Sequence, residues 1–344
     1  MKKITAILLC LVMLLPMCAC GETKDVRELF AMDTVITLTA YGKNADAGLD
    51  AAAGIINSMD TALDPESETG YLSILNNAEG EEVSVTPQIA MMLKTALEVN
   101  AASGGALDLS VYPLYLAWGE FKQDTGKVPS DEDIIALRKK LKFSQTAVNK
   151  LSADGEYTVK MPAGTQISFG AVAKGCAAQY AVDAMSKAGV TSAIVSLGGN
   201  VQTLGLKPDG SKWTVAVEDP NAPGSYLGTL SVGDAAIVTS GNYQRYFIGD
   251  DGVKYHHIID PKTGRPVDNE LLSVTIICDD GTLADCLSTA MYVLGEKAAL
   301  KYWRNNGGFD MILVTNDGRV VCTKGLIEMF TLTNNDDYSS SYAE

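Results

Sequence analysis

Hydrophobic and polar positions along the chain recur with two different periods, and each period predicts one kind of element. Apolar residues have the spacing of an amphipathic helix in four segments, at 45–63, 87–102, 171–188 and 283–294. Alternating or short apolar runs predict strands at 33–41, 193–197, 212–218, 227–232, 235–239, 244–248, 254–259 and 273–278, and a hairpin at 310–323. The strands gather in blocks instead of alternating one by one with helices. This order favours an α+β fold, in which mixed or antiparallel strands pack against helices, over a doubly wound sheet.

The first twenty residues have the pattern of a secretory signal. A basic start is followed by an apolar run over 4–17 that is short for a membrane span, and a polar stretch follows Cys20. A cysteine directly before such a switch resembles a bacterial lipobox, in which residues 1–19 are removed and Cys20 carries the lipid, palmitate included. Cleavage near Ala19, or an uncleaved anchor, is the alternative. We therefore expect a lipoprotein that is anchored to the cell membrane and faces the extracytoplasmic side.

The rest of the chain predicts one folded domain over residues 31–333. About 47% of the 344 residues are hydrophobic, which is enough for a large core. Residues 20–30 are expected to form a tether, and residues 334–344 a polar, frayed tail. The formal net charge of −15 argues against nucleic acid as a partner.

Four cysteines lie beyond the signal: Cys176, Cys278, Cys286 and Cys322. Their spacing matches no zinc ligand set, and each lies in an apolar stretch. We expect all four to be small buried residues.

His256 and His257 are the only histidines of the sequence. A side chain that exchanges protons near neutral pH is therefore rare here, and any general acid-base step has few candidates. The alternative is structural: a strand edge on which one histidine points outward and the other is a satisfied core residue.

Three glycine-containing turns offer backbone donors to a ligand. The stretch 168–175 follows a strand and opens a helix, so its free N–H groups and helix dipole suit a phosphate, and Lys174 adds positive charge. Residues 196–200 form a second turn where backbone and ligand could approach closely. The third, at Thr239-Ser240-Gly241, combines hydroxyl donors with the aromatic Tyr243. A plain strand-to-helix turn is the alternative for the first.

The helix predicted at 283–294 carries oxygens on one face. Asp285, Ser288 and Thr289 stand at positions i, i+3 and i+4. One carboxylate with two hydroxyls is a sparse oxygen set that suits Mg²⁺, because this ion keeps waters and borrows oxygens from substrate phosphates. The alternative is a capping-box-like helix start at Thr282-x-x-Asp285.

A glycine turn at 104–108 precedes a group of aromatic residues that includes Tyr112 and Trp118. Such a group could hold a flat heteroaromatic ring, with Asp108 at its edge. Equally, Trp118 could belong to an apolar core.

In combination, the motifs of this chain resemble the ApbE family, the FAD:protein FMN transferases. Eight of them occur in the family order: Met32-Asp33-Thr34, Leu75-Asn76, Gly105–Asp108 with Pro113-Leu114 and Trp118, Gly170–Gly175, Leu197–Asn200, Thr239-Ser240-Gly241, His257–Gly264, and Ala284-Asp285 through Thr289. The match covers nearly the whole chain after the signal.

The resemblance implies a T-fold-like α+β domain that transfers the FMN moiety of FAD, through a phosphoester bond, to a Thr or Ser hydroxyl of a target protein and releases AMP. It implies Mg²⁺ as cofactor and FAD as substrate, and an acceptor protein with a Ser/Thr flavinylation motif, often from an electron-transfer system. By the same resemblance, Asp285, Ser288, Thr289 and the Ala173 carbonyl would hold magnesium, and His257 would deprotonate the acceptor. The residues that would contact FAD are Met32, Ala106, Leu107, Asp108, Gly170 and Ile259, and the predicted cofactor-binding set also includes Lys174, Thr239, Ser240 and Gly241 from the turns described above.

Some positions depart from the family pattern. No aromatic residue stands near 63–67, Asn242 replaces a common Asp, and Leu107 replaces a frequent Phe. Two other functions therefore stay open from the sequence: a magnesium-dependent FAD pyrophosphatase that yields FMN and AMP, and a non-catalytic flavin-binding or solute-binding lipoprotein.

Overall fold

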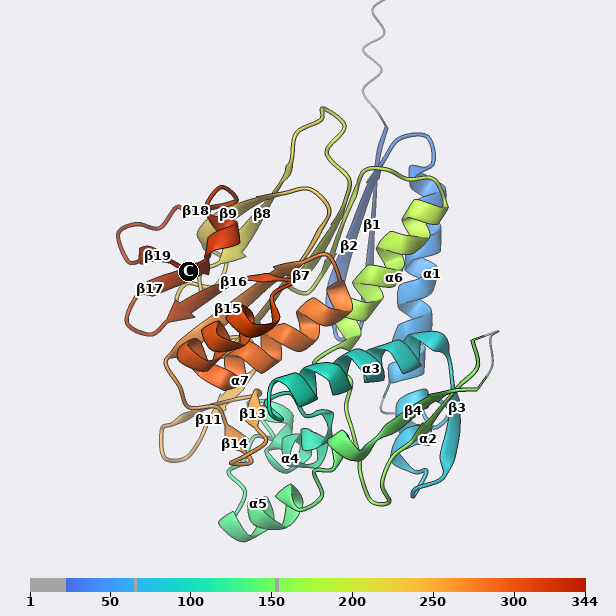
Figure 1. Ribbon diagram of the computed structural model, residues 1–344, viewed down its shortest axis with the longest axis vertical. Helices are drawn as coiled ribbons and strands as arrows, with labels where there is room; N and C mark the ends of the chain where they lie inside the picture. Colours follow the sequence, from blue (N-terminus) through green and yellow to red (C-terminus); the bar gives the residue numbers. More distant parts are fainter. Residues whose placement is uncertain (1–22, 65–66, 152–154) are drawn as a thin grey trace, which may run out of the picture.

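The centre of the molecule is a nine-stranded sheet (Figure 1). The structure, a computed structural model, describes residues 23–64, 67–151 and 155–344. In spatial order the strands are β1 (Lys24–Ala31), β2 (Thr34–Tyr41), β6 (Ala193–Leu197), β7 (Asn200–Leu204), β10 (Ala235–Gly241), β15 (Leu271–Cys278), β16 (Asp310–Thr315), β17 (Arg319–Thr323) and β19 (Ser339–Ala343). All neighbouring strands are antiparallel except β17 and β19. The predicted α+β class is confirmed.

Helices α1 (Ala45–Leu63), α6 (Ala173–Lys187) and α7 (Gly281–Asn306) cover one face of this sheet, and α3 (Pro87–Ala102) packs against α7 and α6 (Figure 1). Successive strand residues point to opposite faces, so Ala236 and Val238 of β10 join the core beneath the helices. Small residues in α6, such as Gly175 and Ala177, let it pack close to its neighbours. This face holds the larger core of the molecule.

A three-stranded sheet covers the opposite face, in the order β18 (Phe330–Leu332), β9 (Tyr226–Val232) and β8 (Trp213–Glu218). Trp213 and Leu230 pack there against Ile237 of β10 and Ile277 of β15. The two cores therefore share the central strands: alternate side chains of each strand point into one core or the other.

A third, smaller cluster lies at one end of the sheet. It joins α4 (Tyr112–Ala117) and α5 (Asp131–Arg138) to two hairpins, β11 (Tyr246–Ile248) with β12 (Lys254–His256) and β13 (Ile259–Asp260) with β14 (Arg265–Pro266). Trp118 is buried in this cluster, stacks on Phe121 and donates from Nε1 to the Gly264 carbonyl at 3.2 Å. Of the two interpretations of Trp118, the core residue fits.

The remaining elements lie beside α3. They are α2 (Tyr71–Asn76) and a small sheet of β3 (Glu82–Val85), β5 (Tyr157–Lys160) and β4 (Ala147–Lys150), with short 3₁₀ turns at Leu109–Val111, Gly119–Phe121, Phe143–Gln145 and Lys324–Leu326.

Both ends of the predicted domain differ from expectation. The tether expected at 20–30 is an edge strand from Lys24 onward, because β1 pairs with β2 through a two-residue turn. The frayed tail expected at 334–344 contains β19, which pairs with β17. The predicted signal and Cys20 lie outside the described residues. Among the residues described, no helix is both long and apolar enough to cross a bilayer.

Candidate active site

The motifs singled out in the sequence meet at one end of the large sheet. Two hairpin tips lie side by side there, because a side chain added at Gly198 would lie 2.3 Å from the Thr34 hydroxyl. Met32 and Asp33 form the first tip with left-handed backbone, φ 53° and 59°. The Met32 N–H donates to the Asp60 carboxylate at 2.7 Å, which holds this unfavourable turn in place.

Helices α6 and α7 touch at the same end through a glycine. A Cβ at Gly175 would lie 2.0 Å from the Gly281 carbonyl oxygen and 2.6 Å from the Asp285 Cβ, so only glycine fits. The Gly175 N–H donates to Asp285 Oδ2 at 2.8 Å. This contact brings Ala173, two residues earlier on α6, close to the buried Asp285 carboxylate.

The hydroxyls of Ser288 and Thr289 on α7 lie beside a hydroxyl of β10. Ser288 Oγ donates to the Asp285 carbonyl at 2.9 Å and lies 2.8 Å from Ser240 Oγ, which is also 3.4 Å from Thr289 Oγ1. Ser240, predicted as a flavin contact, therefore lies with the hydroxyls of Ser288 and Thr289. Its neighbour Thr239 points to the opposite face and bonds Thr275 at 2.8 Å. The role predicted for the Thr239 side chain is therefore not supported.

The capping-box interpretation of Asp285 is wrong. Helix α7 begins at Gly281, and its N-cap is Asp280, whose side chain accepts from the Leu283 N–H at 3.0 Å. Asp285 lies beyond the first turn and faces α6. Within residues 23–64, 67–151 and 155–344, only Oδ2 of this carboxylate has a hydrogen-bond partner, so Oδ1 is the oxygen left for a ligand.

This oxygen set fits Mg²⁺. One carboxylate, the hydroxyls of Ser240, Ser288 and Thr289, and the Ala173 carbonyl are hard donors, which is the kind of set that this ion takes together with waters. No group of three or more His, Cys, Asp or Glu side chains that could hold a metal occurs within residues 23–64, 67–151 and 155–344. The four cysteines are free and buried, as predicted.

The two histidines occupy different environments. His256 is buried, and both of its ring nitrogens are used by the backbone: Nε2 lies 2.9 Å from the Val267 carbonyl and Nδ1 accepts from the Ile258 N–H at 3.3 Å. Its ring meets the edge of Tyr292, with 5.7 Å between centroids. Burial lowers the pKa of His256, so the ring is a neutral structural element.

His257 keeps one nitrogen available. Its backbone N–H and its Nδ1 both lie on the Arg245 carbonyl, at 3.1 and 3.2 Å. Because a carbonyl only accepts, the proton of the neutral ring sits on Nδ1, and Nε2 carries a free lone pair. Burial first, and then the charges of His256, Arg245 and Lys174, lower the pKa of His257 to about 3. The ring is half-buried and neutral, as a base must be.

Positive charge surrounds His257. Arg245 lies 3.9 Å from the Asp33 carboxylate on the β1–β2 tip, and Lys174 on the first turn of α6 is close enough to affect the pKa of the histidine. Both side chains are at least partly accessible. Cations beside a neutral imidazole suit a substrate that brings its own negative charge.

The two turns expected to bracket FAD are joined directly. The Ser168 N–H donates to the Leu109 carbonyl at 3.0 Å, which links the turn at Gly170 to the turn at Asp108. Asp108 Oδ1 already accepts from the Ser110 N–H at 2.8 Å, and burial raises the pKa of Asp108. Asn76 fixes the same region by a pair of bonds to Ile167, at 2.8 and 3.0 Å.

The other predicted flavin contacts differ in exposure. Gly170 is exposed and Met32 half-buried, whereas Ala106 and Leu107 are buried, so these last two could offer backbone atoms only. Ile259 packs into the aromatic cluster around Trp118. At Gly241 a Cβ would lie 2.5 Å from the Tyr243 ring, so glycine is required there for packing.

The sequence singled out the turn that ends at Asn200 but assigned no role to the Asn200 side chain. Asn200 is 3% exposed, and its Nδ2 has no hydrogen-bond partner within the part of the chain that the structure describes. It lies on the face of β7 that also carries Gln202, which bonds Gln179 of α6 at 2.7 Å. Two residues along a strand span about the same length as four to five residues along a helix. Because Gln202 lies beside Gln179, Asn200 therefore lies level with the first turn of α6. The N-cap of α6, Val172, has no capping side chain. An unpartnered amide donor at the level of the helix turn that carries Lys174 fits an anionic ligand such as a pyrophosphate.

Known proteins share this sequence and this architecture. The sequence profile of the ApbE family matches residues 32–313. The FAD:protein FMN transferase of Vibrio cholerae serotype O1 is 33% identical over 284 residues, which cover 81% of this chain and 82% of the relative. The FAD:protein FMN transferase of Treponema pallidum is 31% identical over 330 residues, covering 90% and 91%. The crystal structure of the ApbE protein of Thermotoga maritima matches with a TM-score of 0.79 and 27% identity, over 88% of this chain and 98% of that one. Because the profile spans most of the chain and the relatives align over nearly all of their own length, this protein belongs to the ApbE family.

Proposed function

We propose that this protein is a magnesium-dependent FAD:protein FMN transferase, in which His257 is the base and the oxygens around Asp285 hold the metal. The observation that carries the proposal is the pairing of two features at one end of the sheet. One is a neutral histidine whose Nε2 is free. The other is a buried carboxylate among hydroxyls, held against the start of a helix by Gly175. The names of the most similar relatives support the same reaction.

The reaction would proceed as follows. His257 Nε2 accepts the proton of a Ser or Thr hydroxyl of the acceptor protein. The hydroxyl oxygen then forms a bond to the phosphorus of the FMN half of FAD, while the pyrophosphate P–O bond breaks and AMP leaves with the electron pair. A positioned base typically contributes about 10²–10⁴-fold to such a step.

The pyrophosphate itself would be held by this chain's cations and donors. Lys174 and Arg245 would neutralise its charge, and the Asn200 amide would donate to its oxygens. When bound to Asp285, Ser288, Thr289 and the Ala173 carbonyl, magnesium would neutralise charge on the phosphates and on the leaving AMP. Negative charge on the bound substrate would also raise the pKa of His257 toward a more effective range.

The flavin would lie along the turns at Asp108 and Gly170, beside the Met32 tip. The bond between Ser168 and Leu109 makes these turns one continuous wall. The sequence has no aromatic residue at 63–67, so the half-buried Met32 is our candidate for the ring contact.

The location of the enzyme is part of this proposal. The pattern around Cys20 supports lipidation and an extracytoplasmic position at the cell membrane, with an acceptor from an electron-transfer system. A Cys20→Ser variant should lose its lipid label and leave the membrane fraction; unchanged labelling would contradict the anchor.

The proposed activity is tested by incubating the protein with FAD, Mg²⁺ and an acceptor domain that carries a Ser/Thr flavinylation motif. We expect AMP in solution and an equal amount of flavin that stays on the acceptor after denaturation, both lost on chelation of the metal. Free FMN in place of acceptor-bound flavin would indicate a pyrophosphatase. FAD recovered intact would indicate a binding protein.

A further inference from the structure

Helix α7 is interrupted, and the interruption has a defined construction. Gly295 has φ 74° and ψ 168°, so the helix divides into a first half at 281–294 and a second half at 296–306. In an unbroken helix the N–H of Glu296 would donate to the carbonyl of Tyr292, four residues earlier. That bond is missing, and both of its groups need new partners.

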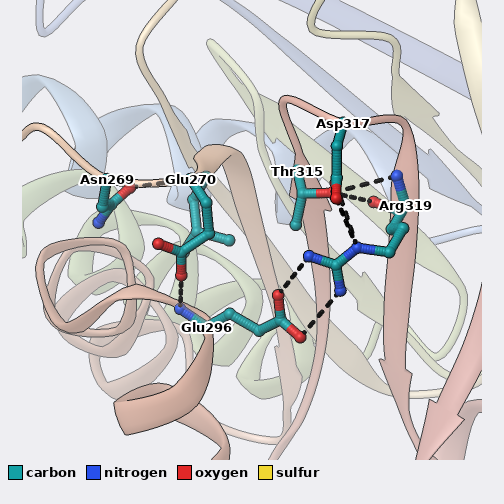
Figure 2. A network of polar contacts seen from close by, with 7 residues as sticks. Asn269, Glu270, Glu296, Thr315, Asp317 and Arg319 are labelled. Atoms are coloured by element: carbon teal, nitrogen blue, oxygen red, sulfur yellow. Dashed lines mark hydrogen bonds and ion pairs between the residues drawn. The ribbon is translucent and has the colours of Figure 1, made fainter.

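Two consecutive residues supply those partners. Asn269 Nδ2 donates to the Tyr292 carbonyl at 2.7 Å, and Glu270 Oε1 accepts from the Glu296 N–H at 2.6 Å. Figure 2 shows Asn269 and Glu270 beside the break, with Glu296 held in turn by Arg319. Asn269 therefore replaces the donor, and Glu270 the acceptor, of the helical bond between residues 296 and 292.

The break also requires glycine. A Cβ at residue 295 would lie 3.2 Å from Glu270 Oε1 and 3.5 Å from Asn269 Nδ2, and its positive φ disfavours other residues. Asn269 keeps its own orientation because its Oδ1 accepts from the Leu271 N–H at 2.9 Å. The glycine at the break and the bond from the Leu271 N–H thus both fix the position of the Asn269 side chain.

The segment 267–271 that contains this pair also contacts His256, the neighbour of the proposed base. Val267 accepts from His256, and the Leu271 carbonyl accepts from the Tyr292 hydroxyl at 2.9 Å. Tyr292 lies one turn beyond Thr289 on the first half of α7 and meets the His256 ring. The segment 267–271 therefore connects His256, which precedes the proposed base, with the C-terminal end of the first half of α7. That half of the helix carries the proposed metal ligands.

We propose that Asn269 is a positioning residue: by holding the Tyr292 carbonyl at the break, it sets the first half of α7, and with it Asp285, Ser288 and Thr289, relative to His257. This inference rests on the proposed metal site. A cavity of about 620 Å³ is lined by Asn269, Glu270 and Gly295. Shortening the Asn269 side chain therefore enlarges an existing opening instead of creating a sealed void, so the variants should fold.

The test measures Mn²⁺ binding by electron paramagnetic resonance, because Mn²⁺ takes the same oxygen donors as Mg²⁺ and its free form is detected directly. Asn269→Ala removes the bond, and Asn269→Asp keeps the shape but sets a carboxylate oxygen against the Tyr292 carbonyl. The matched control is Asn306→Ala, because Asn306 Nδ2 makes the same kind of bond, to the Tyr302 carbonyl at 2.9 Å, on the second half of α7.

We expect both Asn269 variants to bind Mn²⁺ about 10–100-fold more weakly, as removal of a residue behind a metal ligand typically does. The control should change affinity less than about twofold, and FAD binding without metal, followed by flavin fluorescence, should match the parent in all three. Unchanged Mn²⁺ affinity in the Asn269 variants, with only a lower melting temperature, would overturn the inference.

Three further variants separate the possible failures. If Asp285→Asn binds Mn²⁺ as the parent does, the proposed metal site itself is wrong; if it loses Mn²⁺ while Asn269→Asp does not, only the positioning role is wrong. Should the Asn269 variants not fold, Glu270→Ala is expected to weaken Mn²⁺ binding and Glu270→Gln, which restores an acceptor for the Glu296 N–H, to recover it. Equal affinity in these two would also overturn the inference.

Discussion

The two faces of the nine-stranded sheet bury different chemistry, although the same strands supply both. On the helix-covered face, Ser240 of β10 meets Ser288, and Gln202 of β7 meets Gln179. On the other face, Ile237 of β10 packs against hydrocarbon from the three-stranded sheet. One step along a strand separates the two environments: Ser240 lies with the proposed metal ligands, and Thr239 with Thr275.

The difference follows from what covers each face. Helices α6 and α7 bring polar groups to the face that they cover: the Gly175 N–H bonds the Asp285 carboxylate, and Gln179 bonds Gln202. Polar groups on the strands can therefore be satisfied there, and the Asn200 amide is left for a ligand. A covering sheet has its backbone groups paired with each other and offers only side chains, which at Trp213 and Leu230 are apolar. We conclude that substitutions on the helix face should alter chemistry and those on the other face stability.

The largest effect is expected at Asp285. Asp285→Ala removes the only carboxylate of the proposed metal set, so magnesium-dependent AMP release should fall by more than the roughly 10²–10⁴-fold typical of a lost base. The matched variant on the other face, Thr275→Val, should retain activity and cost about 1 kcal/mol of stability, because it breaks one hydrogen bond. Full turnover in Asp285→Ala, measured by chromatography of AMP, would place the metal elsewhere.

Substitutions of the two adjacent histidines should also differ, one affecting activity and the other stability. His257→Ala should lower flavin transfer by about 10²–10⁴-fold while FAD and Mn²⁺ still bind. His256→Ala should lower the melting temperature instead, because it leaves the Val267 carbonyl without its partner. The assignment fails if His256→Ala is the variant that loses transfer, as judged by flavin fluorescence on the denatured acceptor.

Trp213 tests the apolar face. Its side chain is 5% exposed and its Nε1 donates to the Gly205 carbonyl at 3.0 Å. Trp213→Ala should lower the free energy of unfolding by about 3–5 kcal/mol, measured in urea, because it leaves a cavity. Affinity for FAD, measured well below the unfolding midpoint, should stay at the parent value; a large loss would show that the two faces are coupled.

A smaller effect is expected from the two neighbours on β10. Ser240→Ala should weaken Mn²⁺ binding several-fold, since a hydrogen bond of about 1 kcal/mol to the Ser288 hydroxyl is lost. Thr239→Val should leave Mn²⁺ binding unchanged and affect stability alone. Equal Mn²⁺ affinity in the two variants would remove Ser240 from the site.

The smallest effect concerns pH. The pKa of His257 is lowered to about 3 from an ordinary value of 6.5, so between these values the unfolded chain binds a proton that the folded protein does not. Stability of the metal-free protein should therefore fall as the pH drops from 6.5 toward 3, and this residue contributes no change above 6.5. In His257→Gln the fall should be shallower, by less than about 1.4 kcal/mol per pH unit because the ring is partly solvated. Identical slopes in urea titrations would contradict the lowered pKa.

The sequence predicted local elements well where spacing and end signals agree. The helices at 45–63 and 87–102 have the bounds of α1 and α3, and the segment 283–294 lies within the first half of α7. The second half was missed because Gly295 ends the periodic pattern although the chain continues as a helix. Strand β1 was missed because its charged residues, such as Lys24 and Glu28, read as a tether, whereas pairing with β2 makes it a strand.

The candidate site could be predicted only in part for a related reason. Spacing within one helix identified Asp285, Ser288 and Thr289, since their relation is local. The contributions of Ser240, Asn200 and Asn269 depend on which strand lies beside which helix, and a linear pattern carries no such information. The break at Gly295 and its two partners likewise become visible only when residues 269 and 270 are brought to it.

The most direct test of the account is intact-mass spectrometry of an acceptor domain after incubation with FAD and Mg²⁺, with the parent protein and with His257→Ala and Thr275→Val. We predict that the parent and Thr275→Val add one FMN to the acceptor, and that His257→Ala adds none in the same time. Equal addition by His257→Ala and the parent, or an acceptor that stays unmodified while the parent releases free FMN, would contradict the account.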